Sequence, residues 1–229
     1  RARLGPVKHA VVVSRLFAPE PAAAAFRLEA LVRALASGGI DVTVLTSRAR
    51  PGSPPADDDA LSRPPADGPR LPADGGTGHL RADDAPGAPP GDTPRGPARP
   101  GRVRVRRARV LRDSSGYVRG YLPYLSFDVP AALRLLTVRR PDVVVVEPPP
   151  TTGVVVRLVC ALRRVPYVYY AADVWSDAAR STGSPRVVSA LLARLEGWAL
   201  RGARGVVAVS EGVARRVREL ARREVDVEV

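Results

Sequence analysis

Short runs of β-branched apolar residues alternate along the chain with segments whose apolar positions recur every three or four residues. The apolar runs predict strands at residues 7–13, 41–46, 102–110, 142–147, 167–172 and 205–210, and residues 225–229 also have a strand pattern. The amphipathic segments predict helices at residues 22–36, 129–138, 152–163, 185–201 and 211–222. Strands that alternate with helices form a parallel sheet covered on both faces, so the pattern predicts a Rossmann-like α/β fold.

Residues 51–101 interrupt this alternation with a tract of different composition. The tract holds 13 prolines, 9 glycines and 8 aspartates, and almost no large apolar side chains. Such a segment cannot bury enough surface to offset the entropy that it loses on ordering. We therefore predict a single domain over residues 4–229, with a disordered loop insertion at residues 51–101 that contributes nothing to the core.

The composition excludes several classes of protein. One cysteine and two histidines cannot build a disulfide scaffold or a Cys/His zinc site. No apolar run approaches the roughly 20 residues of a membrane-spanning helix. The net charge of +13 comes almost entirely from arginine, and no recognition helix or aromatic-interleaved basic strand accompanies it, so we expect no nucleic-acid partner. His9 and Cys160 are interpreted as packing residues.

In an open parallel sheet, ligands bind where the strands end. The first predicted strand is not followed by the G-x-G-x-x-G of dinucleotide-binding folds, and the chain contains no G-x-x-x-x-G-K-[ST] phosphate loop. Both nucleotide fingerprints are absent, so a dehydrogenase or a P-loop enzyme is not expected.

A different set of motifs stands at these strand ends. In chain order, the motifs are F-A-P-E at Phe17–Glu20 with D-V-T-V-L-T at Asp41–Thr46, R-P-D-V-V-V-V-E at Arg140–Glu147, P-Y-V at Pro166–Val168, D-V-W at Asp173–Trp175, E-G-W at Glu196–Trp198 and A-R-G-V-V-A-V-S at Ala203–Ser210. This order resembles the family 4 glycosyltransferases of the GT-B fold, and in particular members similar to O-antigen and capsule transferases.

The resemblance implies the first, acceptor-binding domain of a two-domain enzyme, with the C-terminal donor domain outside this chain. It implies transfer of a sugar with retention of configuration, from a nucleotide-sugar donor to a lipid-linked, polysaccharide or metabolite acceptor, without a metal cofactor. The chain alone is then expected to be inactive. Two alternatives are a non-catalytic acceptor-binding subunit of a split transferase, and another GT-B chemistry such as a sugar-nucleotide 2-epimerase.

The resemblance also implies site residues. Asp173 follows a buried strand, at the position where relatives carry a polar residue near the reacting sugar hydroxyl, and it is the catalytic candidate. Its structural alternative is a cap of the following turn. The substrate-binding candidates are Ala22, Ala23, Ala24, Arg27, Glu147, Thr151, Thr152, Trp175, Ser210 and Glu211.

These binding candidates have structural alternatives as well. The alternatives are a plain helix start for the three alanines, helix caps for Thr151 or Thr152 and for Ser210, a contact to a neighbouring helix for Glu147, a solvated position for Arg27 and a core position for Trp175. Glu211 and Glu219 share the E-x7-E spacing of the family's second domain. We interpret that spacing instead as pairing between glutamates and arginines on one helix.

An aromatic and basic segment precedes the helix predicted at residues 129–138. The segment contains Tyr117, Tyr121, Tyr124 and Phe127, with Arg119 before them and Arg134 after them. Aromatic rings at headgroup depth and arginines near anionic lipid are typical of a membrane interface, and the same mixture also fits an acceptor lid. The expected localisation is cytoplasmic, or peripheral at the inner face of the plasma membrane.

Overall fold

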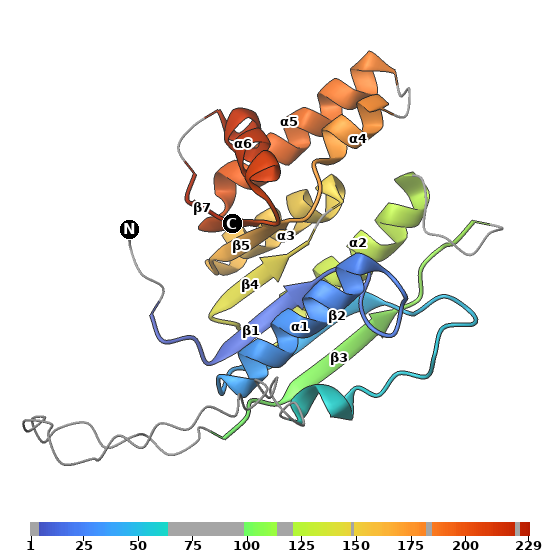
Figure 1. Ribbon diagram of the computed structural model, residues 1–229, viewed down its shortest axis with the longest axis vertical. Coiled ribbons are helices and arrows are strands. Elements are labelled where there is room, and N and C mark those ends of the chain that lie inside the picture. Colours follow the sequence, from blue (N-terminus) through green and yellow to red (C-terminus); the bar gives the residue numbers. More distant parts are fainter. Residues whose placement is uncertain (1–4, 64–98, 114–120, 148, 182–184, 223–224) are drawn as a thin grey trace, which may run out of the picture.

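The computed structural model describes residues 5–63, 99–113, 121–147, 149–181, 185–222 and 225–229, and its elements follow the predicted alternation (Figure 1). The strands are β1 (His9–Val13), β2 (Asp41–Ser47), β3 (Val103–Ala108), β4 (Val143–Val146), β5 (Tyr167–Ala171), β6 (Gly205–Ala208) and β7 (Val227–Glu228). The α-helices are α1 (Ala23–Ser37), α2 (Tyr121–Thr137), α3 (Pro150–Arg163), α4 (Trp175–Ser181), α5 (Arg186–Gly202) and α6 (Glu211–Ala221), and Asp59–Ser62 form the 3-10 helix η1.

All seven strands are parallel and lie in one sheet, in the order β3-β2-β1-β4-β5-β6-β7. The order reverses between β1 and β4, because the chain builds outward from β1 in one direction and then in the other. The carboxyl ends of β1 and β4 therefore meet at a switch point, which is where open α/β sheets bind ligands. The prediction of a parallel Rossmann-like sheet is confirmed.

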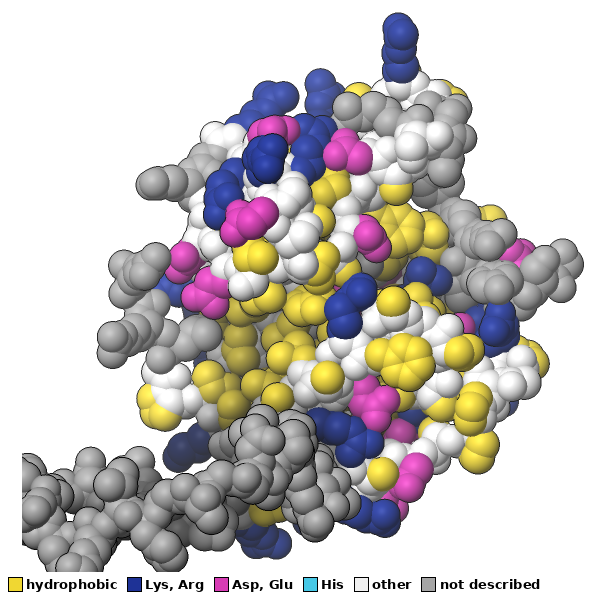
Figure 2. Space-filling view, viewed as in Figure 1, with side chains coloured by type: hydrophobic (Ala, Val, Ile, Leu, Met, Phe, Trp, Pro, Cys, Tyr) yellow, Lys and Arg dark blue, Asp and Glu magenta, His cyan; other side chains and the backbone are white. Residues whose placement is uncertain are grey.

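Helices cover both faces of the sheet. On one face, α1 and η1 pack against alternate residues of the strands, including Val12, Val42 and Val44. On the other face, α2 and α3 pack against the intervening residues, such as Val11 and Val144, in a core that also takes in side chains of α5 and α6. On the α1 face, hydrophobic side chains gather between α1 and α6, over β4 and β5 (Figure 2).

Local chemistry sets several helix boundaries. α1 is rich in alanine and ends at Gly38, and Gly39 follows with a φ of 82°, a conformation that glycine adopts without strain. α3 begins earlier than expected, because Pro149 occupies the N-cap position and Pro150 the first helical position. The prediction that Thr151 or Thr152 caps this helix is wrong, since both lie inside its first turn.

Two helices differ from the expected pattern. α2 begins at Tyr121 rather than near residue 129, and it contains Pro130 in its interior. α4 was not expected, because its seven residues are too few to show a helical period. No helix within the described residues is both long and apolar enough to cross a membrane.

The Pro/Gly/Asp tract is described only at its two ends, and residues 64–98 lie outside the described residues. At the first end, the side chain of Leu61 is only 3% exposed and joins the α1 core. Arg33 donates a hydrogen bond to the Ala60 carbonyl at 2.7 Å. At the other end, the Gly101 N–H donates to the Ala36 carbonyl at 2.7 Å. The prediction that residues 51–101 contribute nothing to the core is therefore wrong at Leu61, and Gly101 is held to the end of α1 by a backbone hydrogen bond.

Candidate functional site

The carboxyl ends of β1, β4 and β5 enclose a small polar cavity of about 70 Å³. Its lining comes from the loop after β1, the first turn of α1, and the residues that follow β4 and β5. The lining residues are Ser14, Arg15, Leu16, Ala24, Glu147, Ala172, Asp173 and Trp175. Four of the predicted site residues, Ala24, Glu147, Asp173 and Trp175, are thus brought together.

Glu147 forms the buried floor of this cavity. Glu147 follows β4 directly. The parallel pairing of β4 with β1 extends to this residue, because the Glu147 N–H donates a 3.0 Å hydrogen bond to the Val13 carbonyl. The residue is 5% exposed, and its carboxylate accepts a 2.7 Å hydrogen bond from the Ser14 hydroxyl. Burial raises the pKa of Glu147, and the hydrogen bond from Ser14 offsets part of that rise.

The charges around Glu147 act in opposite directions. The guanidinium groups of Arg27 and Arg15 lower its pKa, whereas the charge of Asp173 raises it. Both arginines and Asp173 are thus within electrostatic reach of Glu147 at this strand edge. The arrangement can hold one group with exchangeable protons, such as a sugar hydroxyl, between carboxylates and cations.

An aromatic wall stands beside these charges. The Arg15 guanidinium lies 5.2 Å from the centre of the Tyr124 ring, and Tyr124 meets Trp175 edge to face with 5.9 Å between ring centres. Burial lowers the pKa of Arg15, and the nearby Glu20 and Glu147 favour its charged form. Trp175 is half-buried in this wall rather than in the core.

Asp173 is exposed and borders the cavity directly after β5. Within the described part of the chain its carboxylate makes no hydrogen bond and no ion pair. The start of α4 is capped instead by Glu196, whose two carboxylate oxygens accept hydrogen bonds from the Trp175 and Ser176 N–H groups at 3.1 and 3.2 Å. The alternative role of Asp173 as a turn cap is therefore filled by another residue.

The first turn of α1 faces the same cavity. Ala22 is the N-cap in an extended conformation, with no side-chain cap, and Ala23 and Ala24 follow in the first turn. The first N–H groups of a helix have no intrahelical partner and carry the positive end of the helix dipole. Arg27 is half-buried one turn later, and among the described residues its Nε has no hydrogen-bond partner.

The two threonines of α3 do not line the cavity. Thr152 is fully buried, and its hydroxyl donates a 2.5 Å hydrogen bond to the carboxylate of Asp128 on α2. Burial raises the pKa of Asp128, and this hydrogen bond opposes the rise. The hydroxyl of Thr151 is also buried, and it too opposes the rise in the pKa of Asp128. A direct substrate contact is therefore not supported for Thr152, whose role is to hold α3 against α2.

Ser210 and Glu211 also lie outside the cavity. Ser210 is the N-cap of α6 and accepts a 3.3 Å hydrogen bond from the Val213 N–H. Glu211 is exposed in the first turn of that helix, and Glu219 pairs with Arg216 at 2.5 Å. This pairing agrees with the structural interpretation of the E-x7-E spacing.

The interpretation of Cys160 as a packing residue is confirmed, since it is buried in the core and burial raises the pKa of its thiol to about 12. His9 lies at the opposite edge of the sheet, where its Nε2 is 3.1 Å from the Thr43 hydroxyl. Among the described residues, no group of three or more His, Cys, Asp or Glu side chains is placed to bind a metal ion.

Sequence reasoning missed Ser14, Arg15 and Tyr124 at the site and Asp128, which bonds to Thr152. Ser14 and Arg15 follow β1 immediately, so their position at the ligand edge was a usable signal. Tyr124 and Asp128 carried no such signal, because the pattern did not predict that α2 extends to them. Tyr124 was interpreted as part of a membrane interface or of an acceptor lid together with Phe127, which is in fact buried in the core. Tyr117 and Arg119 lie outside the described residues.

Comparison with known proteins places the chain in a defined group. Residues 23–229 match the family described as "Glycosyl transferase 4-like domain". No curated protein matches the chain in sequence.

Similar solved structures include Anabaena Alr3699/HepE in complex with UDP, with 12% identity and a TM-score of 0.44, covering 93% of this chain and 41% of that one. They also include Arabidopsis thaliana UGT89C1 complexed with UDP-L-rhamnose, with 12% identity and a TM-score of 0.44, covering 90% and 46%. A ugt transferase from Siraitia grosvenorii in complex with UDP has 12% identity and a TM-score of 0.46, covering 96% and 50%. The chain thus spans half or less of the length of these proteins.

Proposed function

Because the chain belongs to the glycosyl transferase 4-like domain family, we propose that it is the acceptor-binding domain of a retaining glycosyltransferase. The donor is a nucleotide sugar, and a C-terminal donor domain outside this chain completes the enzyme. The proposed reaction uses no metal cofactor. The observation that carries the proposal is the polar cavity at the switch point of the sheet, where Asp173 and Glu147 face the same space.

In this proposal, Asp173 contacts the acceptor. Its carboxylate is exposed at the cavity mouth and makes no bond to the described protein, so it is available to accept a hydrogen bond from the reacting hydroxyl. A carboxylate in that position orients the hydroxyl and favours the charge that develops as its proton leaves. Glu147 lies deeper and is already bonded to Ser14, so it holds the cavity floor and the loop after β1.

The cations of the site serve the donor side of the reaction. Arg27 and the first N–H groups of α1 present positive charge at the cavity edge, where a diphosphate leaving group accumulates negative charge. Arg15 is fixed over Tyr124 and lies near Glu147, so its role is to position the loop after β1.

The experiment is Asp173→Asn in the protein that contains this chain together with its donor domain. We expect turnover of nucleotide sugar with acceptor to fall by about 100-fold, the range of a positioned proton-handling group, with little change in melting temperature. Asp226→Asn is the matched control, because Asp226 is exposed beside β7 and away from the cavity. Near-normal turnover in Asp173→Asn together with a lower melting temperature would refute the assignment.

The acceptor class is proposed from the outer surface of α2. Five large apolar side chains stand exposed at helical spacing on this helix: Leu122, Leu125, Val129, Leu133 and Leu136. The same helix contributes Tyr124 to the wall of the cavity. An apolar stripe on a helix that also borders the site suits a lipid-linked acceptor at a membrane surface, with the protein bound peripherally at the cytoplasmic face.

Vesicle sedimentation tests this part of the proposal. The double variant Leu122→Ser with Leu133→Ser removes side chains that are 72% and 59% exposed, and we expect it to lose binding to mixed phosphatidylcholine and phosphatidylglycerol vesicles. Leu158→Ser with Leu162→Ser on α3 is the control, because these side chains are similarly exposed on another helix. Equal binding by both double variants would remove the lipid-linked acceptor from the proposal.

A further inference from the structure

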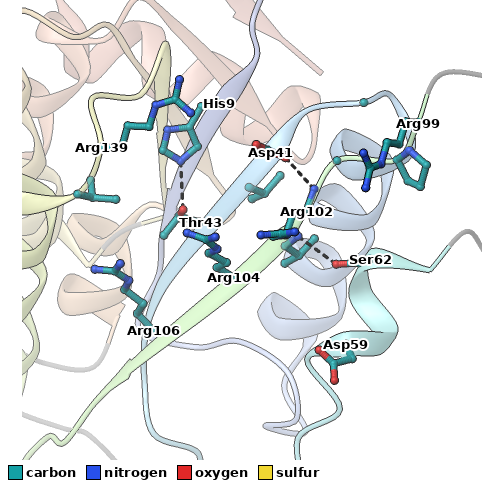
Figure 3. Close-up of a pocket in the computed structure, with 16 residues that line it drawn as sticks. His9, Asp41, Thr43, Asp59, Ser62, Arg99, Arg102, Arg104, Arg106 and Arg139 are labelled. Atoms are coloured by element: carbon teal, nitrogen blue, oxygen red, sulfur yellow. Dashed lines mark hydrogen bonds between the residues drawn. The ribbon is translucent and has the colours of Figure 1, made fainter.

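A second and much larger cavity lies at the opposite edge of the sheet. It has a volume of about 960 Å³ and is formed where β1, β2 and β3 begin and where α2 ends (Figure 3). None of its lining residues belongs to the cavity at the carboxyl ends of the strands. The proposed transfer reaction therefore makes no use of it.

Arginine dominates the lining of this second cavity. Five arginines line it: Arg99, Arg102, Arg104, Arg106 and Arg139. Arg104 and Arg106 alternate along β3, so both side chains project from the same face of this edge strand, roughly 6.6 Å apart along it. In Figure 3 they extend toward the face that carries Thr43 and His9, and Arg139 lies beside His9 from the segment after α2.

Acidic side chains of the described residues do not pair with these arginines. Within the described residues, none of the five guanidinium groups makes an ion pair or a hydrogen bond. The lining includes two carboxylates, and Asp41 already accepts a 2.8 Å hydrogen bond from the Arg102 backbone N–H. Asp59 lies on η1, on the other side of β3 from His9 in Figure 3.

Arg107, the next residue on β3, differs from the cavity arginines because it is paired with an acidic side chain. It projects from the opposite face of the strand, where its guanidinium binds both carboxylate oxygens of Asp58. Arg33 on α1 and Arg216 on α6 are also paired with acids. Arg33, Arg107 and Arg216 thus have carboxylate partners, whereas the five arginines of the cavity have none among the described residues.

We propose that this cavity binds a ligand that carries two or more phosphate groups. Guanidinium groups remain charged at any physiological pH and match phosphate oxygens with paired N–H donors. Arginines that approach one space from β3 and from the α2–β4 segment can bind more than one phosphate at once. The lining holds no Phe, Tyr or Trp, so stacking on nucleic-acid bases is not part of the recognition.

Two sources could supply this chemistry, a soluble polyphosphate compound or the headgroups of anionic lipids, and the test separates them. The first arm titrates the 229-residue chain with sodium tripolyphosphate in a calorimeter. The second arm sediments the chain with phosphatidylglycerol vesicles. Both arms use the double variant Arg104→Ser with Arg106→Ser and a control, Arg215→Ser with Arg218→Ser, which removes the same charge from exposed positions on α6.

We expect the cavity variant to bind tripolyphosphate about 100-fold more weakly than the wild type, about tenfold for each lost arginine, and the control to bind like the wild type. Binding should also weaken as salt is raised. Loss of vesicle binding in the cavity variant alone, with no tripolyphosphate binding in any protein, identifies lipid headgroups as the ligand. Equal behaviour of the two variants in both arms, or no binding of either probe, would overturn the proposal.

Discussion

The two edges of one parallel sheet present opposite kinds of polar site. At the carboxyl edge, the cavity is about 70 Å³, and its charged groups are held close together, with Glu147 bonded to Ser14 and Arg15 fixed over Tyr124. At the amino edge, the cavity is about 960 Å³ and is lined by exposed arginines without partners among the described residues. The first edge is organised before any ligand arrives, and the second depends on its ligand for neutralisation.

The difference follows from the connections at each edge. At the carboxyl edge, loops and helix starts from three strands converge, so short side chains meet and bury one another. At the amino edge, the cavity lies beside β3, which is the outermost strand of the sheet. The long side chains of β3 have a neighbouring strand on one side only. Substitution of the buried, hydrogen-bonded side chains at the carboxyl edge should therefore change stability, whereas removal of arginines at the amino edge should not.

The largest expected loss of stability comes from Leu61→Ala, next to the cavity at the amino edge. Leu61 belongs to η1, whose Asp59 and Ser62 line the large cavity, and its buried side chain packs into the α1 core. Truncation should lower the free energy of unfolding by about 2 kcal/mol or more in urea titrations. Leu162→Ala, at a position 74% exposed, is the control and should stay within about 0.5 kcal/mol. Equal small effects would restore the prediction that residues 51–101 contribute nothing to the core.

At the carboxyl edge, Thr152→Val should cost about 1 to 2 kcal/mol, because it removes the hydrogen bond that the buried carboxylate of Asp128 accepts from Thr152. Thermal unfolding monitored by circular dichroism measures the loss. The matched control is Thr137→Val, where the hydroxyl is exposed at the end of α2. If both variants have the same melting temperature, the hydrogen bond between α2 and α3 does not stabilise this edge.

Glu147→Gln should instead stabilise the protein at neutral pH and raise its melting temperature. The change in the free energy of unfolding should be smaller than the losses expected for Leu61→Ala and Thr152→Val. Burial raises the folded-state pKa of Glu147 above its ordinary value of 4.5, so the ionised side chain disfavours the folded state at neutral pH. As the pH falls through the folded-state pKa toward 4.5, wild-type Glu147 becomes protonated and the advantage of the variant should shrink.

Melting curves of wild type and Glu147→Gln across this pH range test the prediction. Glu228→Gln, at an exposed position of β7, is the control and should show no such pH dependence. A variant that is less stable than the wild type at neutral pH would show that Glu147 stabilises the fold rather than serving the site.

The smallest effect should come from Arg104→Ser with Arg106→Ser. Because neither guanidinium has a partner among the described residues, the free energy of unfolding should change by no more than about 0.5 kcal/mol. Urea titration at low salt gives the value. A loss above about 1 kcal/mol would mean that these arginines stabilise the sheet edge, and the contrast between the two edges would not hold.

The sequence alone determined the fold class and the family. Strand and helix periods depend on neighbours two to four positions apart, so the seven strands and most helices could be predicted without any knowledge of the fold. The ordered motifs predicted the family that residues 23–229 match. The position of Asp173 and Glu147 at one edge followed as well, because parallel strands in an alternating α/β chain bring their carboxyl ends together.

Only the tertiary structure decided which side chains meet. Ser14 and Glu147 are bonded across 133 positions of the chain, and Thr152 and Asp128 across 24. The structure assigned the cap of α4 to Glu196 and so left Asp173 available, and it placed Leu61 in the core. It also gathered arginines from β3 and from the end of α2 around one cavity. Such contacts depend on how helices and loops pack on the sheet, and local sequence periodicity carries no record of that packing.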